Sequence, residues 1–260
     1  MYKRQNLHVE QHGRDSHPST VVLLSSIGTT GDAWAKQIPV LTRDHRVITV
    51  DHRGHGGSET PNCQPGTVTV QQLAEDILAA LDAIGVARFH IVGLSLGGAL
   101  AQWIAANTTR VDKAVFACTA TYLGGEDKWS ERTRTARTQG MAAMADGFLK
   151  NWFTQGFRDT NPATVQQVRD MVCSIDAEGY AQNGDALAKW DFASELGKIT
   201  CPVLTIAGAD DPTTPPQELA AIARGVAGPV ESVVIEPGSH QVAIERPEEF
   251  NQVLTRFLED

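Results

Sequence analysis

The stretch Phe89-His-Ile-Val-Gly-Leu-Ser-Leu-Gly-Gly98 decides the fold of this chain. Its first half is an apolar run of the kind that forms a buried strand, and small and apolar residues continue at helical spacing from Leu96 to about Asn107. Ser95 therefore stands in a tight turn between a strand and a helix, within the pattern Gly-x-Ser-x-Gly. Glycines suit such a strained turn because they leave room around the serine. The pattern predicts that Ser95 is a nucleophile rather than a serine that only caps the helix.

Short apolar runs and helical periodicity alternate on both sides of this turn. Thr69 and Gln72 have capping-box spacing at the start of one helix, and Gly85 suits the position after its end. The predicted strands are residues 21–25, 46–51, 89–93, 114–118, 202–207 and 232–235, and the predicted helices include 69–84, 96–107, 217–223 and 248–258. This alternation predicts an α/β fold with a mostly parallel central sheet flanked by helices.

The alternation is interrupted between Tyr122 and Leu196, where helical segments rich in Arg, Thr, Ala and Gln replace it. An insertion of about 70 residues is too long for a plain loop. We predict one α/β core built from residues 1–121 and 197–260, with residues 122–196 inserted as a helical cap. The cap is expected over the carboxyl ends of the strands, where open α/β sheets bind ligands.

Composition and charge disfavour several classes of function. Lys and Arg number 22 against 31 Asp and Glu, so the net charge of −9 argues against nucleic acid and against an anionic membrane face. No apolar run approaches the length of a bilayer span, and no secretory signal is visible. The four cysteines form no C-x-x-C pair, which predicts free thiols in a cytoplasmic protein and neither disulfides nor a metal site. An anionic small molecule stays compatible with this composition if a buried cation meets it.

A serine nucleophile needs a base, and the base needs a carboxylate that orients it. In the fold that the turn indicates, these residues follow one another as serine, acid and histidine. His240 is the one histidine after Ser95, and it follows the last predicted strand. The acid is expected after residues 202–207, where Asp210 and Asp211 both stand. We favour Asp211, because the turn Asp-Pro-Thr-Thr-Pro would hold its carboxylate near the loop of His240.

Attack on a carbonyl produces an oxyanion that needs two preorganised donors. We expect these to be the backbone N–H of Leu96, beside a helix N-terminus, and that of Ile27, in the loop after the first predicted strand. Ser25 and Ser26 in that loop are interpreted as hydrogen-bonding residues, since no base is evident that would make either a second nucleophile. His55 is interpreted as a structural turn residue at the border of the site.

With these motifs the chain resembles the α/β-hydrolase superfamily, and within it the 3-oxoadipate enol-lactonase family of aromatic catabolism. The resemblance spans nearly the whole chain. It rests on Ser-Ile-Gly-Thr at 26–29, Trp34, Gln-Ile-Pro at 37–39, Asp-His-Arg-Gly-His-Gly at 51–56, Gly-Leu-Ser-Leu-Gly-Gly at 93–98, and, in the cap, on Trp-Ser-Glu-Arg at 129–132, Asn-Trp-Phe-Thr at 151–154, Phe157 and Glu-Gly-Tyr-Ala at 178–181. The family usually has Asn-Ser-Leu-Gly at 25–28 and Asn-Thr-Ala at 119–121. Both departures lie near the expected pocket and leave the identity of the substrate open.

The resemblance implies a serine hydrolase that opens a small, carboxylate-bearing enol-lactone through an acyl-enzyme, without metal or cofactor. Arg132 is then the candidate to hold the substrate carboxylate, and Trp129 would supply an apolar wall. The alternatives for these two residues are a solvated arginine and a tryptophan in the core of the cap. At the level of function, the alternatives are a carboxylesterase or cofactor-free perhydrolase of neutral esters, and a binding module that has kept the fold. The sequence does not predict an oligomeric state.

Overall fold

In the part of the chain that the structure describes, seven strands form one sheet in the order β1-β3-β2-β4-β5-β6-β7. The computed structural model describes residues 6–259. The strands are β1 (Val9–His12), β2 (Thr20–Leu24), β3 (Arg46–Val50), β4 (Phe89–Leu94), β5 (Val111–Ala117), β6 (Val203–Gly208) and β7 (Val230–Ile235). β1 pairs antiparallel with β3, and the other neighbouring strands are parallel. The predicted α/β fold with a mostly parallel sheet is confirmed.

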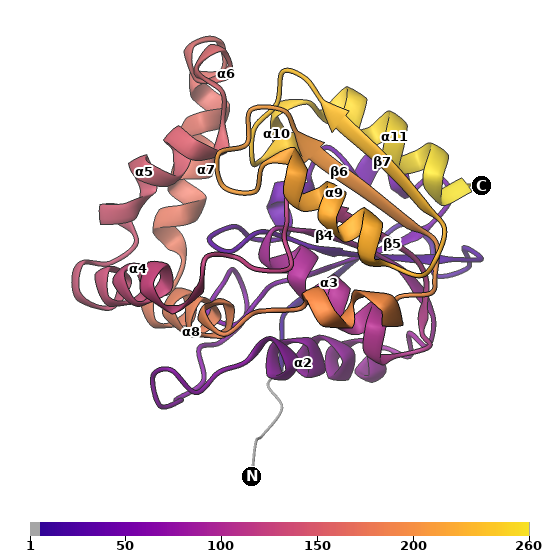
Figure 1. Cartoon of the computed structure of the whole chain (residues 1–260), viewed down its shortest axis with the longest axis horizontal. Helices are drawn as coiled ribbons and strands as arrows, with labels where there is room; N and C mark the ends of the chain where they lie inside the picture. Colours follow the sequence, from indigo (N-terminus) through magenta and orange to yellow (C-terminus); the bar gives the residue numbers. More distant parts are fainter. Residues whose placement is uncertain (1–5, 260) are drawn as a thin grey trace.

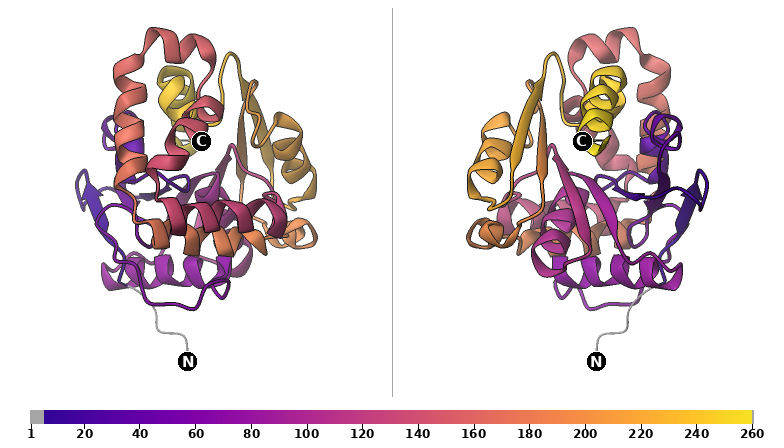
Figure 2. Two further views of the ribbon diagram at one scale, coloured as in Figure 1. Left: turned by 90° about the vertical axis from the view of Figure 1, so that its left-hand side faces the viewer. Right: turned by 90° about the vertical axis from the view of Figure 1, so that its right-hand side faces the viewer.

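Helices cover both faces of the sheet (Figure 2). Three pack on one face, α2 (Val70–Ala83), α3 (Leu96–Asn107) and α9 (Pro216–Gly225), and two on the other, α1 (Ile38–Leu41) and α11 (Pro247–Glu259). Alternate residues of the strands serve the two faces, because successive side chains of a strand point in opposite directions. In β2, Val22 and Leu24 belong to the first core, and Val21 and Leu23 to the second. Both faces of the inner strands are therefore buried, which explains their unbroken apolar runs.

The ends of α2 follow the local signals of the sequence. The Thr69 side chain accepts a hydrogen bond from the backbone N–H of Gln72, and the Gln72 side chain accepts one from the backbone N–H of Thr69. Gly85, just after the helix, has φ +72°, a conformation that glycine adopts at low cost. The capping box and the glycine stop predicted from the sequence are both confirmed.

Five helices follow β5 and gather on one side of the molecule (Figure 1): α4 (Gly125–Gln139), α5 (Ala142–Trp152), α6 (Gln155–Thr160), α7 (Pro162–Ser174) and α8 (Ala177–Ala188). The short helix η2 (Ala193–Lys198) then leads into β6. Trp129, Phe148 and Tyr180 in these helices are buried in the same continuous apolar cluster as Leu24 and Leu96 of the sheet layer. The cap helices thus share a core with the sheet, and the domain limits at residues 122 and 196 stay a prediction.

Some short elements had no counterpart in the sequence analysis. They are β1, α1, the helix η1 (Gly31–Trp34) and the helix α10 (Val242–Glu245). β1 is a partly exposed edge strand whose residues Val-Glu-Gln-His form no apolar run, so its strand character depends on pairing with β3. Within residues 6–259, no helix is both long enough and apolar enough to cross a bilayer.

The register of the parallel strands brings their carboxyl ends to one edge of the sheet. Leu24 pairs with Gly93, Leu94 with Ala117, and Gly208 with Ile235. The loops that follow β2, β4, β6 and β7 therefore open at the same edge. This edge carries the residues that the sequence analysis selected.

Candidate active site

Ser95 occupies the sharp turn between β4 and α3. Its backbone has φ 57° and ψ −112°, outside the regions that a serine ordinarily adopts, and several contacts hold this conformation. The Ser95 N–H donates to the Ala117 carbonyl at 3.0 Å, and the Ser95 carbonyl accepts from Thr119 Oγ1 at 2.8 Å. Gly97 is required by space, because a Cβ there would lie 2.0 Å from the Leu24 carbonyl oxygen. The strained turn is thus fixed from both neighbouring strands.

His240 and Asp211 form a buried pair beside this turn. His240 Nδ1 donates to Asp211 Oδ2 at 2.8 Å, and Thr214 Oγ1 donates to the same oxygen at 2.7 Å. Asp211 Oδ1 accepts from the backbone N–H groups of Thr213 at 2.7 Å and Thr214 at 3.1 Å. Burial raises the pKa of Asp211, but the charge and hydrogen bond of His240 and the bonds of Thr214 outweigh it, so the pKa lies below its usual value. An ionised carboxylate has no proton to give, so Nδ1 carries the proton and Nε2 is left as a base.

Asp210, the alternative acid, makes different contacts. Its Oδ2 accepts from the Gly238 N–H at 3.2 Å, and its own N–H donates to the Gly238 carbonyl at 2.8 Å. These bonds join the loop after β6 to the loop after β7. Of the two candidate acids, only Asp211 contacts the imidazole of His240 within the described residues.

Ser95 and His240 line one small cavity beneath the cap, with a volume of about 30 Å³. The cavity also receives both residues that the resemblance implicated in substrate binding, Trp129 and Arg132. Its lining is Ser26, Ile27, Ser95, Leu123, Lys128, Trp129, Arg132, Phe148, Asn151, Trp152, Tyr180, Thr213 and His240. Apolar and aromatic walls with a few polar groups are typical of a site for a small molecule.

Ile27, in the loop after β2, lines this cavity. Beside it, the Gly28 N–H donates to His55 Nε2 at 3.0 Å, and His55 Nδ1 donates to a backbone carbonyl at 2.8 Å. Burial, followed by the neighbouring His52, lowers the pKa of His55 to about 3, so this ring is neutral and can accept the bond. Within residues 6–259, the N–H groups of Ile27 and Leu96 donate no hydrogen bond. Both amides are therefore without a hydrogen-bond acceptor in the described part of the chain, and their role as an oxyanion hole stays a prediction.

The two serines of this loop are engaged in hydrogen bonds. Ser25 Oγ donates to the Thr29 carbonyl at 3.2 Å, and Ser26 Oγ donates to the Ile27 carbonyl at 3.2 Å. Ser26 Oγ also accepts from Gln241 Nε2 at 3.0 Å. These contacts agree with the interpretation of a hydrogen-bonded loop.

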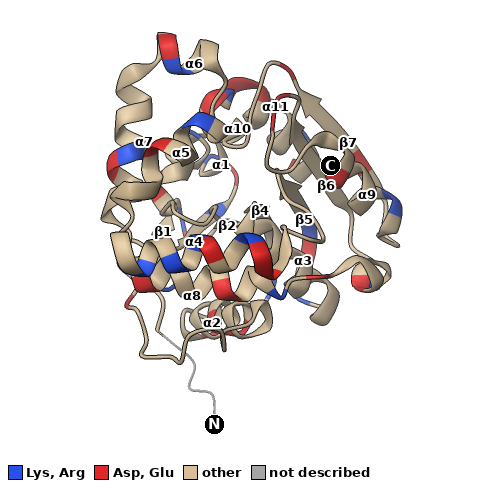
Figure 3. Ribbon diagram, turned by 60° about the vertical axis from the view of Figure 1, so that its left-hand side comes forward, with Lys and Arg blue, Asp and Glu red and all other residues tan. Residues whose placement is uncertain are grey.

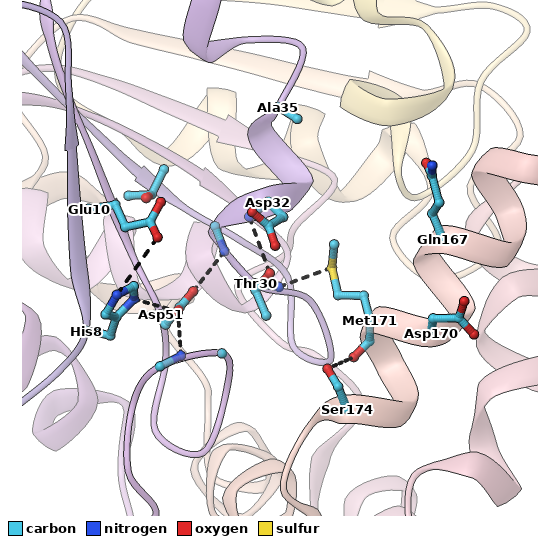
Figure 4. A pocket seen from close by; sticks show the side chains of 14 residues that line it. His8, Glu10, Thr30, Asp32, Ala35, Asp51, Gln167, Asp170, Met171 and Ser174 are labelled. Atoms are coloured by element: carbon cyan, nitrogen blue, oxygen red, sulfur yellow. Dashed lines mark hydrogen bonds and ion pairs between the residues drawn. The ribbon is translucent and has the colours of Figure 1, made fainter.

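A larger and more open cleft, of about 700 Å³, lies on the other side of this loop and contains none of Ser95, Asp211 and His240 (Figure 4). The carboxylate of Asp51 forms its centre, accepting from the N–H of Gly31 at 2.8 Å, the N–H of Gly57 at 3.0 Å and His8 Nδ1 at 3.0 Å. These bonds brace the loops on either side. Its further carboxylates, Glu10, Asp32 and Asp170, make the cleft unsuitable for an anion. No group of three or more His, Cys, Asp or Glu within residues 6–259 could hold a metal ion.

The loop that carries His240 is also attached to the cap. Ser239 Oγ donates to the Asn151 carbonyl at 2.9 Å, and the Ser239 N–H donates to Glu245 Oε2 at 3.0 Å. The other oxygen of Glu245 accepts from the N–H of Thr154 at 3.1 Å, at the start of α6. The buried carboxylate of Glu245 thus joins the cap to the residue before His240. The sequence analysis did not identify Glu245, because its role depends on the distant Thr154.

Arg132 lies over two aromatic rings of the cavity wall. Its guanidinium carbon is 5.3 Å from the centroid of the Trp129 ring and 5.9 Å from that of Phe148. It forms no ion pair with an acidic group of residues 6–259. The sequence analysis assigned no role to two further polar side chains of the cavity, Lys128 and Tyr180. Lys128 and Arg132 are four residues apart and therefore share a face of α4, a spacing that could have revealed Lys128.

Comparisons with known proteins agree with this geometry. Residues 19–247 match the family described as alpha/beta hydrolase fold. The chain is 32% identical to 3-oxoadipate enol-lactonase 2 of Acinetobacter baylyi, over 95% of this chain and 90% of the relative. It superposes on the crystal structure of the enol-lactonase from Burkholderia xenovorans LB400 with a TM-score of 0.94, 33% identity and full coverage of both chains. A thermophilic esterase from Thermogutta terrifontis is 25% identical, with a TM-score of 0.89 over 97% of this chain and 93% of that one. The chain therefore belongs to the α/β-hydrolase family and is a hydrolase of esters or lactones.

Proposed function

We propose that this enzyme opens a small enol-lactone that carries a carboxylate side chain, with 3-oxoadipate enol-lactone as the substrate and 3-oxoadipate as the product. The catalytic residues are Ser95 as nucleophile, His240 as base and Asp211 as the acid that orients it. The backbone N–H groups of Ile27 and Leu96 form the oxyanion hole.

The unpaired Arg132 in the Ser95 cavity carries this proposal. A half-buried guanidinium without an acidic partner is costly unless the ligand supplies one. A neutral ester has no charge that would meet it, whereas the side-chain carboxylate of the lactone can accept two parallel N–H···O bonds. The aromatic rings of Trp129 and Phe148 hold the guanidinium plane and leave its edge for the substrate.

In the first half of the reaction, Ser95 Oγ attacks the lactone carbonyl carbon while His240 Nε2 takes its proton. Asp211 stabilises the imidazolium that forms, through the bond to Nδ1. The N–H groups of Ile27 and Leu96 donate hydrogen bonds to the carbonyl oxygen as it becomes negatively charged. The intermediate then collapses with cleavage of the ring C–O bond. The enol oxygen that leaves takes the proton from His240, and the enol ketonises.

In the second half, a water molecule attacks the acyl carbon of the ester on Ser95. His240 Nε2 removes a proton from this water and returns it to Ser95 Oγ as the ester bond breaks. The product carries two carboxylates, the one present in the substrate and the one formed at Ser95. No redox group or further co-reactant is needed for this sequence.

Hydrolysis of 3-oxoadipate enol-lactone, followed by the loss of its ultraviolet absorbance beside an aryl acetate control, tests the proposal. We expect the wild type to prefer the lactone, and Arg132→Met to lower the ratio of kcat/KM for lactone over aryl acetate about 10- to 100-fold, the worth of a charge-assisted contact. Labelling of Ser95 by a fluorophosphonate and its loss in Ser95→Ala would identify the nucleophile. A ratio that Arg132→Met leaves intact would show that the carboxylate assignment is wrong.

The second candidate is a carboxylesterase or cofactor-free perhydrolase acting on a neutral ester. The similarity to an esterase and the apolar walls of the cavity favour it. It would use the same Ser95, Asp211 and His240, so the two activities are separated by their dependence on the cations of the cavity, Arg132 first. Failure of Ser95 to react with a fluorophosphonate would instead favour a binding module.

The setting proposed for this enzyme is the cytoplasmic catabolism of aromatic compounds. The enol-lactonases that the chain resembles support the pathway, and the four free cysteines suit a reducing compartment.

A further inference from the structure

The cavity contains a second cation, Lys128, in the first turn of α4. The Lys128 side chain folds back toward the start of its own helix, because a Cβ on Gly124 would lie 2.3 Å from its Cδ and 3.2 Å from its Nζ. Gly124 is the N-cap residue of α4, so the ammonium group lies beside the helix N-terminus. From there it lines the cavity that Ser95 and His240 also line. Figure 3 shows that charged residues of both signs are spread over the rest of α4.

Three effects make this an unfavourable place for an ammonium group. The N-terminus of a helix carries partial positive charge and favours anions. Arg132, four residues on, is a like charge on the same face of the helix. The group is also half-buried, and no acidic group of residues 6–259 forms an ion pair with it. Burial, and next the charge of Arg132, lower the pKa of Lys128, while the charge of Asp211 acts in the opposite direction. The distant charge of Asp211 offsets these costs only in part, because the pKa of Lys128 remains lowered.

A buried hydroxyl of the same cavity also lacks an acceptor. Tyr180, in α8, is fully buried; the guanidinium of Arg132 lies beside its hydroxyl oxygen, but within residues 6–259 no acceptor takes the hydroxyl proton. Burial raises the pKa of Tyr180 to about 12, so the phenol keeps its proton as a donor. An unsatisfied buried hydroxyl normally costs stability, which is why most are paired. Two cations and one hydroxyl donor thus line one cavity. Within residues 6–259 neither cation has an anionic partner, and the hydroxyl proton has no acceptor.

We infer that Lys128, together with Arg132 and the Tyr180 hydroxyl, forms a binding site for the substrate carboxylate, and that Lys128 determines the preference of the enzyme for anionic substrates. The site deepens the proposed function and rests on it for the identity of the substrate. A carboxylate has two oxygens and about four acceptor positions, enough for all three donors. The bound carboxylate supplies the negatively charged partner that is missing for the helix N-terminus, Lys128 and Arg132.

The test compares Lys128→Met and Tyr180→Phe with the matched control Arg134→Met. Arg134 is an exposed cation of the same helix, is absent from the cavity lining, and makes no ion pair within the described residues. We expect Lys128→Met to lower the lactone to aryl acetate ratio of kcat/KM about 10- to 100-fold, mainly through KM, and Lys128→Arg to restore part of it. Tyr180→Phe should lower the ratio by a smaller factor. Arg134→Met should leave it as in the wild type.

Thermal unfolding separates binding from a structural role. If Lys128 is kept for the ligand, removing its charge should leave the Tm unchanged or raise it, as is common where activity requires an unfavourable group. Tyr180→Phe should change the Tm little, since the hydroxyl proton has no acceptor to lose within the described residues. A lowered Tm with an unchanged ratio would mean that Lys128 is structural and would overturn the inference.

A second arm does not depend on the lactone. Hexanoate and its neutral analogue hexanamide are compared as competitive inhibitors of aryl acetate hydrolysis. The wild type and Arg134→Met should bind hexanoate more tightly than hexanamide, and Lys128→Met should lose most of this preference. If the wild type fails to hydrolyse the lactone but shows this pattern, the proposed substrate is wrong and the carboxylate site stands. If Lys128→Met keeps the preference of the wild type, the carboxylate site is wrong, whatever the result with the lactone.

Discussion

Replacing Asp211 with asparagine is expected to abolish most of the activity, and replacing the adjacent Asp210 is not. Both substitutions remove one negative charge and keep the size of the side chain. Only the first changes the acceptor of the His240 Nδ1 proton. An asparagine at 211 can turn its NH2 group to the ring and donate to Nδ1. The imidazole proton would then lie on Nε2, and Nε2 could no longer accept the proton of Ser95.

The size of the effect follows from the geometry of the pair. At the 2.8 Å between Nδ1 and Oδ2, a carboxylate stabilises an imidazolium by about 6 kcal/mol in a medium of effective dielectric constant near 20. That energy corresponds to a loss of about 10⁴-fold in kcat, at 1.36 kcal/mol for each factor of ten. Asp210 offers no such interaction, because its carboxylate accepts from the backbone N–H of Gly238. An asparagine oxygen can accept the same bond, so Asp210→Asn should stay within about threefold of the wild type, the effect expected of a site outside the catalytic pair.

The assay is the initial rate of aryl acetate hydrolysis, which needs no assumption about the natural substrate. Circular dichroism and thermal unfolding would verify that both variants are folded. Titration with a fluorophosphonate would count the functional sites in each preparation. A folded Asp211→Asn that keeps more than a tenth of the wild-type kcat, or an Asp210→Asn that loses as much as Asp211→Asn, would refute the assignment of the acid.

Three further predictions test the surroundings of the site. Gly98→Ala should unfold at clearly lower urea concentration, because its Cβ would lie 2.6 Å from Cβ of Thr119, whereas Gly147→Ala, in open space on α5, should be neutral or stabilising by about 0.5–1 kcal/mol. The pKa of His55 is lowered to about 3 in the folded chain. Below about pH 6.5, His55 therefore binds a proton in the unfolded chain but not in the folded chain. The free energy of unfolding should therefore fall with falling pH by up to about 1.4 kcal/mol per unit for this group, and urea titrations of His55→Gln should show a shallower slope. Glu245→Gln keeps one acceptor oxygen where two are used, so it should lower kcat and destabilise by about 1–3 kcal/mol, measured by kinetics and urea unfolding together.

The parts of the fold that were predicted are those in which local pattern and burial agree. The inner strands are apolar runs because both of their faces are covered. A capping box begins α2, and a glycine follows its end. β1 was missed because a partly exposed edge strand needs no apolar run and is defined by its partner β3. The left-handed conformation of Cys118, with φ 40°, was not predictable either, because no local preference of cysteine leads to it.

The candidate site divides in the same way. Ser95 is marked by its own neighbours in the chain, and chain order then selects His240, so the sequence alone leads to the proposal of both. The choice between Asp210 and Asp211 needed the contacts of each carboxylate, which depend on how two loops meet. The role of Lys128 needed still more, because it rests on which face of α4 lines the cavity and on the absence of an acidic partner within residues 6–259.

The chain has a net charge of −9, yet the proposed site favours an anion. The pairing of charges explains how the two are compatible. Cations outside the cavity, such as Arg88, Arg137 and Arg169, form ion pairs with nearby carboxylates, so their charge is largely neutralised at short range. Lys128 and Arg132 have no such partner among the described residues. At physiological salt, exposed charges more than about 8 Å away are screened, while charges in a half-buried cavity are not. The potential that a substrate meets at Ser95 therefore depends more on the charged side chains nearest the cavity, among them the two cations without an acidic partner, than on the sum over the surface. The charge that a pocket favours is better inferred from which side chains lack a partner than from composition.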